Sequence, residues 1–228
     1  MNSAIRNARL AGLLIVIAMI AGIFSVAPSV DSLQYLTEAV NNTDQVIIAA
    51  VFQFIMGLAY MGVALLFYSA IKQFGKGLAV GFLSFRIIAT TLVVIGTLLL
   101  LSILALSTEY AKQLPQDSAA FEAIGNMLKI TRDHINHVFM IIVLCIGNIL
   151  LYLLLIKSRL IPRWLSAWGI IGALFSIIAS VLVLFQAVDI ITTEYIVLNV
   201  PTGLQEIVLA IWLLTKGFNK EVLSVDHR

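Results

Sequence analysis

The chain has 228 residues, of which 61% are hydrophobic and 11% are charged, and its mean hydropathy is +1.05. Soluble domains carry about 25% charged residues, and a domain of this length leaves roughly a third of its unfolded-chain surface in contact with solvent. The composition therefore excludes a soluble enzyme and a nucleic-acid-binding protein. The formal net charge of +2 adds no strong global field, and the single cysteine, Cys145, excludes an intrachain disulfide.

Six stretches reach the length of about 20 mostly apolar residues that a membrane-spanning helix needs. They cover residues 10–27, 46–71, 78–106, 138–156, 164–188 and 196–215. These stretches predict an all-α fold, a bundle of six transmembrane helices that forms a single domain over residues 1–228. The first stretch also resembles a secretory signal, because Arg6 and Arg9 precede it and Ser25-Val26-Ala27 resembles a cleavage site. Pro28 directly after that site disfavours cleavage, so we expect a retained first helix.

The basic residues alternate along the chain and predict the topology of the bundle. They occur before the first span, between the second and third, between the fourth and fifth, and in the tail, as Arg6, Arg9, Lys72, Lys76, Lys157, Arg159, Arg163, Lys216, Lys220 and Arg228. The connections 28–45 and 189–195 contain Asp and Glu but no Lys or Arg, and the connection between the third and fourth spans is mixed. Because Lys and Arg are retained on the cytoplasmic side, both termini are expected in the cytoplasm.

Two charged residues lie deep inside the predicted spans. Arg86 lies eight residues into the third span and Glu206 ten residues before Lys216, at depths of about 12 and 15 Å for a rise of 1.5 Å per residue. We expect a buried Arg86–Glu206 ion pair. Its remaining hydrogen bonds are expected from Asn148, and from Ser84 or Gln205. A clamp that fixes helix packing is favoured, because the charges cancel, and a substrate or proton site is the alternative.

A second polar layer is expected on the outer side, and it consists of Asp133, His134, His137, Gln53, Gln186 and Asn199. His134 and His137 are three residues apart and Asp133 and His137 four apart, so both pairs can meet on one helix face. The two imidazoles could hold a divalent metal together with carboxylates. The alternatives are a polar helix entrance, in which Asp133 orients His137, and an outward-facing pocket for a small ligand. The sequence requires no other cofactor.

The function stays open, because no HExxH, GxSxG, P-loop or GxGxxG motif occurs. A ligand-binding, sensing or accessory membrane protein without chemistry of its own is the favoured hypothesis. The alternatives are a small-solute or ion transporter and an intramembrane enzyme acting on a lipid or quinone, with Asp133, His134 and His137 as acid–base candidates. The expected partners are the lipid bilayer, a small ligand or lipid, and a further copy of the chain, but no nucleic acid.

The run from Lys157 to Gly172, KSRLIPRWLSAWGIIG, resembles the central signature of a large uncharacterised family of bacterial six-helix membrane proteins. This family is the domain of unknown function four-three-eight-six. Residues 81–88, Thr131-Arg132-Asp133 and residues 206–219 are similar to other parts of that family, so the resemblance covers nearly the whole chain. It implies a retained first helix and a multi-pass protein of the bacterial inner membrane, and it implies no activity.

Overall fold

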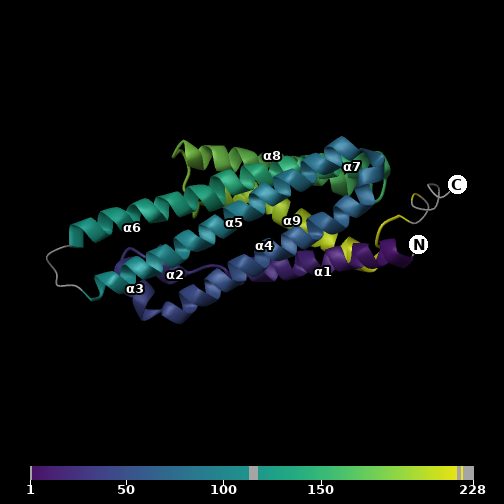
Figure 1. Cartoon of the computed structure of the whole chain (residues 1–228). Helices are drawn as coiled ribbons and strands as arrows, with labels where there is room; N and C mark the ends of the chain where they lie inside the picture. The colour runs from purple at the N-terminus through teal and green to yellow at the C-terminus, as the bar shows by residue number, and fades with distance from the viewer. Residues whose placement is uncertain (1, 113–117, 220–221, 223–228) are drawn as a thin grey trace.

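The computed structural model describes residues 2–112, 118–219 and 222. This part of the chain is helical without strands (Figure 1). The elements are α1 (Asn2–Phe24), α2 (Pro28–Asp31), α3 (Tyr35–Asn41), α4 (Thr43–Ile71), η1 (Lys72–Phe74), α5 (Lys76–Tyr110), α6 (Ser118–Asp133), η3 (His134–Phe139), α7 (Met140–Ser158), α8 (Arg163–Leu184) and α9 (Thr193–Thr215). Six helices within the described residues are long and apolar enough to cross a membrane, as the hydropathy of the sequence predicts.

The six long helices form a closed ring in chain order. Each of α1, α4, α5, α7, α8 and α9 packs against the next, and α9 packs against α1. The start of α1 and the end of α9 lie at the same end of the bundle (Figure 1). We call this the terminal end and the opposite one the distal end. The basic residues that predict the topology, from Arg6 to Lys216, belong to helix ends and turns at the terminal end, whereas Lys220 and Arg228 lie outside the described residues.

The fifth predicted span ends earlier than expected. It was predicted to continue to residue 188, but α8 ends at Leu184. Gln186 adopts a positive φ of 55°, and the N–H groups of Gln186 and Ala187 donate to the carbonyls of Val183 and Leu182. This pair of bonds satisfies the last carbonyls of the helix and turns the chain away. Hydropathy cannot detect such a stop, because the residues beyond it are still apolar.

The distal part of the bundle extends beyond the length that a membrane requires. The helix formed by α6, η3 and α7 is continuous over residues 119–158, or 40 residues, and therefore about 60 Å long. The hydrocarbon core of a bilayer is about 30 Å thick. The predicted fourth span, residues 138–156, thus covers only the second half of a longer helix. The first half of this helix, α6, packs against α5, and α3 also packs against α5.

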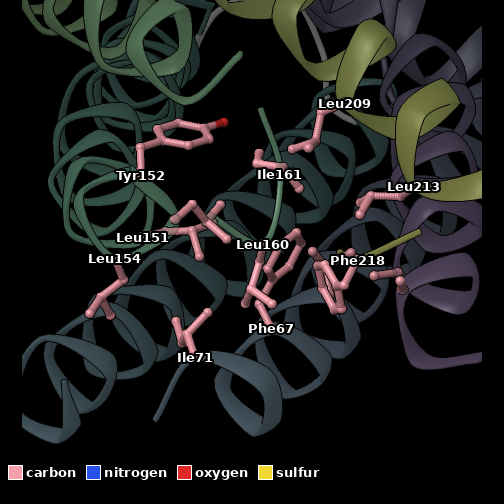
Figure 2. Packing of buried hydrophobic residues seen from close by; sticks show 14 of the residues in the cluster. Phe67, Ile71, Leu151, Tyr152, Leu154, Leu160, Ile161, Leu209, Leu213 and Phe218 are labelled. Carbon is pink, nitrogen blue, oxygen red and sulfur yellow. The ribbon is translucent and has the colours of Figure 1, made fainter. Parts of the chain in front are cut away.

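Each half of the bundle has its own hydrophobic core. The larger core lies towards the terminal end, where Phe67 and Phe218 pack edge to face with ring centroids 5.6 Å apart (Figure 2). The second core joins α2, α3 and α4 to the distal half of α5, and it includes Val30, Ala39 and Ile103, all fully buried. The short helices α2 and α3 are therefore packed parts of the fold.

Ser107 ties α3 to α5. Its fully buried hydroxyl donates to the Leu36 carbonyl at 2.7 Å and accepts from the Val40 N–H at 2.9 Å. We expect Ser107→Ala to lower the free energy of unfolding by about 1–2 kcal/mol, because two buried backbone groups lose their partner. Denaturant unfolding in detergent measures this loss. Ser102→Ala is the matched control, because the exposed Ser102 hydroxyl bonds only to Leu98 of its own helix; equal losses in both variants would contradict the prediction.

Candidate functional site

Arg86 and Glu206 line the same small cavity at the centre of the ring. Its walls come from α1, α4, α5, α7 and α9, as Ile15, Tyr60, Val63, Phe67, Arg86, Leu151, Tyr152, Glu206 and Leu209. The cavity volume is about 10 Å³, which is near the smallest space that holds one water molecule. The ring therefore brings both charged residues to its axis but leaves no room for a solute there.

Arg86 is held by neutral groups. Arg86 is only 5% exposed, and its Nη2 atom donates a hydrogen bond to Asn148 Oδ1 at 2.6 Å. The guanidinium carbon lies 5.5 Å from the ring centroid of Tyr60 and 5.6 Å from that of Phe82, within the range of cation–π attraction. The Nε and Nη1 atoms of Arg86 are buried without a partner among the described residues.

The expected direct ion pair between Arg86 and Glu206 is not formed. Glu206 accepts a hydrogen bond of 2.9 Å from the Tyr60 hydroxyl instead. The ion pairs of the described residues are Glu109–Lys112 and those of Arg132 with Asp31 and Asp133. The reason is the ring order: α5 and α9 are not neighbours, so their charged side chains face each other across the cavity and not across a helix contact.

The other two residues of this predicted layer have different positions. Gln205 is 1% exposed, accepts from the Tyr152 hydroxyl at 2.8 Å and donates to the Leu165 carbonyl at 3.3 Å, so it joins α9 to α7 and α8. Ser84 is exposed, and its expected place in the buried layer is wrong. Side chains two positions apart on a helix differ by about 200° in direction. Ser84 therefore points away from the side that Arg86 occupies. Tyr60 and Tyr152, which were not among the residues predicted from the sequence, belong to the layer.

A larger cavity lies on the axis nearer the distal end, and we call it the distal pocket. Its volume is about 420 Å³, which is in the range of small-molecule binding sites. Its polar wall consists of Ser25, Asp31, Gln53, Arg132, Asn136 and His137, and its apolar wall includes Met56, Val93, Leu100, Met140, Ile141, Ile190 and Ile191. The pocket is thus built from several helices and two connections.

Arg132 organises the charges of the distal pocket. Its Nη2 atom lies 2.5 Å from Asp31 Oδ1 and 2.7 Å from Asp133 Oδ1, and its side chain is 10% exposed. The sequence suggested that Asp133 orients His137. Asp133 instead pairs with Arg132. Sequence reasoning did not select Arg132 or Asp31, because both fall in connections where charges are usually solvated. The one signal that pointed to Arg132 is the resemblance of Thr131-Arg132-Asp133.

Two carboxamides on the wall of the distal pocket have no protein partner. The side chains of Gln53, which is 8% exposed, and of Asn136 make no hydrogen bond to any described residue. The Asn136 carboxamide packs against Gly96, where a Cβ would overlap it, and its Oδ1 atom is buried and unsatisfied. Buried polar groups are normally paired, so an unpaired one calls for an explanation. The sequence selected Gln53 by depth but missed Asn136.

The two histidines do not act together. Residues 134–139 form a π-turn, η3, whose wider hydrogen-bonding pattern rotates residues three apart away from each other. His137 Nδ1 lies 3.1 Å from the Tyr195 hydroxyl, and the residue lines the distal pocket. His134 Nδ1 lies 2.9 Å from the Ile130 carbonyl, and the residue lines a different pocket. The expectation that both imidazoles share one face is therefore wrong.

The remaining members of the predicted outer layer are also divided. Gln186 and Asp133 line the second pocket with His134, whereas Asn199 lines neither pocket and donates to the Tyr195 carbonyl of its own helix at 2.9 Å. Within the described part of the chain, no group of three or more His, Cys, Asp or Glu side chains could hold a metal ion. The two imidazoles of the predicted metal site, His134 and His137, line different pockets and so do not form a common ligand set.

The fold and these sites define a polytopic helical membrane protein with polar cavities along its axis. The family model of the domain of unknown function DUF4386 matches residues 10–217, so the chain belongs to this family. It is the family that the run from Lys157 to Gly172 had indicated. The comparisons with curated proteins and with solved structures found no match.

Proposed function

We propose that the protein binds a small uncharged ligand in the distal pocket. The observation that carries this proposal is the pair of unpartnered carboxamides, Gln53 and Asn136, on the wall of one cavity. Each carboxamide can donate and accept hydrogen bonds. Asn136 Oδ1 is fully enclosed against Gly96, whereas the other amide atoms of Gln53 and Asn136 stay accessible without a partner among the described residues, so a ligand can pair with these atoms.

The charges and the apolar walls define the chemistry of the ligand. Arg132 faces two carboxylates, Asp31 and Asp133, so the site has no excess positive charge for an anion. Methionine and aliphatic side chains form much of the remaining wall. A neutral amphipathic molecule with an amide, carbonyl or hydroxyl group fits this combination, because its apolar body is desolvated while its polar group replaces the missing hydrogen-bond partners.

We further propose that the protein resides in a bacterial inner membrane with both termini in the cytoplasm. The basic turns at the terminal end and the basic-free connections 28–45 and 189–195 support this orientation. The distal pocket then opens towards the outer side, and the ligand reaches it from there. A sensing or accessory role follows naturally from such a site.

Binding is favoured over transport by the separation of the two axial cavities. The distal pocket and the cavity between Arg86 and Glu206 share no lining residue. The enzyme hypothesis has no comparable support, because its acid–base candidates are divided: His137 lines the distal pocket, whereas Asp133 and His134 line the second pocket. A transporter would show solute flux in proteoliposomes that is lost in Glu206→Gln.

The test of the proposed site is a thermal-shift screen of neutral amphipathic amides, alcohols and quinones against the purified protein. We expect a compound whose affinity falls at least about tenfold in Asn136→Leu and in Gln53→Leu, because one ligand hydrogen bond is lost. The stability of ligand-free Asn136→Leu should be unchanged or higher, because the substitution removes an unpaired buried acceptor.

Asn199→Leu is the matched control for this screen. Asn199 was expected in the same layer but does not line the distal pocket, so its replacement should leave the affinity of a compound unchanged. A screen without any stabilising compound, or compounds whose affinity survives both Asn136→Leu and Gln53→Leu, would contradict the proposal.

A further inference from the structure

A basic pocket lies at the terminal end, between the α7–α8 turn and the end of α9. Its volume is about 670 Å³, and its lining residues are Arg159, Leu160, Ile161, Pro162, Arg163, Trp212, Lys216, Gly217, Phe218 and Asn219. We call it the basic pocket. It is remote from the distal pocket and shares no lining residue with it.

The floor of the basic pocket is part of the hydrophobic core. Leu160, Ile161 and Phe218 are 0%, 3% and 1% exposed and belong to the cluster shown in Figure 2. The Asn219 N–H donates to the Leu160 carbonyl at 2.9 Å, and this bond joins the chain after α9 to the α7–α8 turn. The two walls are therefore held together by the fold.

The rim of the basic pocket is positively charged. Arg159, Arg163 and Lys216 are exposed, and among the residues that the structure describes they have no carboxylate partner and no Asp or Glu lines the pocket. Arg163 is the first residue of α8, where the helix dipole adds positive potential. Arg159 adopts a φ of 55°, a left-handed conformation that residues with a Cβ rarely adopt. Three cations thus converge on one concave site.

The aromatic and apolar residues around this pocket are typical of a membrane–water interface. Trp212 lines it, and Trp164 and Trp168 stack on the adjacent start of α8 with ring centroids 6.4 Å apart. Tryptophan is enriched at the membrane–water interface. Ile211 and Leu214, on the same turn of α9 as Trp212, are 55% and 36% exposed, so an apolar surface continues from the pocket into the bilayer.

We propose that the basic pocket binds the phosphate group of an anionic phospholipid. Basic pockets between membrane helices are suited to such headgroups, and arginine pairs with phosphate oxygens through parallel hydrogen bonds. The acyl chains would lie along the exposed apolar side chains of α8 and α9. The proposal does not depend on the ligand of the distal pocket.

The experiment counts lipids bound to the purified protein by native mass spectrometry, with phosphatidylglycerol and phosphatidylcholine as probes. One cation near a membrane surface contributes roughly fivefold to the affinity for an anionic lipid. We therefore expect phosphatidylglycerol to bind the double variant Arg159→Gln/Arg163→Gln roughly 25-fold more weakly than the wild type. Phosphatidylcholine should bind the wild type and the variant weakly and alike.

Lys72→Gln/Lys76→Gln is the matched control, because it removes two charges from the other basic turn of the same end, outside the pocket. Equal losses in both double variants would show attraction by the general surface charge and overturn the proposal, as would equal binding of both lipids to the wild type. Inorganic phosphate distinguishes the source of the group. If it displaces phosphatidylglycerol at millimolar concentration, the pocket takes soluble phosphate compounds and the lipid assignment fails.

Discussion

Glu206→Gln is expected to lower the free energy of unfolding by about 3 kcal/mol, because it leaves the buried guanidinium of Arg86 without a compensating charge. Among the described residues, Glu206 is the only carboxylate that lines the central cavity, although a direct ion pair is absent there. Two guanidinium nitrogens of Arg86 already have no described partner. In the low dielectric of the ring interior, attraction across the cavity therefore matters more than it would at a surface.

The double variant Arg86→Met/Glu206→Gln decides what this pair does. If the pair is a clamp, removing both charges should restore more than half of the stability lost in Glu206→Gln, as measured by denaturant titration in detergent. Additive losses would show that the two charges do not interact. Glu194→Gln is the control on the same helix, because Glu194 is exposed in the first turn of α9, and it should change the stability by less than about 0.5 kcal/mol.

Arg132→Gln is expected to lower the free energy of unfolding by about 2 kcal/mol, because it removes the cation between two carboxylates. The value is below that of a fully buried pair because Asp31 is 48% exposed and Asp133 28%, so solvent screens their repulsion. The variant should also abolish binding in the distal pocket, since α2 is no longer tied to the end of α6.

Thermal unfolding of Arg132→Gln and of Arg132→Gln/Asp133→Asn measures this effect. Neutralising Asp133 removes the repulsion and should recover a large part of the lost stability. Asp133→Asn alone should cost less than Arg132→Gln, because Arg132 still pairs with Asp31. An unchanged midpoint in Arg132→Gln would show that the network contributes nothing to the fold.

The number and approximate positions of the helices could be predicted from hydropathy alone. Every backbone group inside a bilayer must be paired within the protein, so each long apolar run forms a helix regardless of its neighbours. The spans at Thr43–Ile71 and Thr193–Thr215 accordingly begin only three residues before the predicted positions. The end of α8 was predicted too late, because the backbone turn at Gln186 determines where the helix ends. Hydropathy does not reveal this turn.

The candidate sites could be predicted only in part. Depth along each span brought Arg86, Asn148 and Glu206 to one level, because the rise per residue is the same in every helix. Depth along a span does not determine which side of a helix faces a given neighbour. Glu206 therefore meets Tyr60, and not Arg86, and Ser84 points out of the bundle.

The sequence by itself determined the membrane as solvent, the six spans and the residues that are too polar for lipid. Only the tertiary structure decided which of them meet. The ring order places α5 opposite α9, the π-turn separates His134 from His137, and the continuous helix α6–η3–α7 carries Arg132 and Asn136 to the distal pocket. These outcomes depend on contacts between helices far apart in the chain, whereas hydropathy and helical rise are properties of each segment alone.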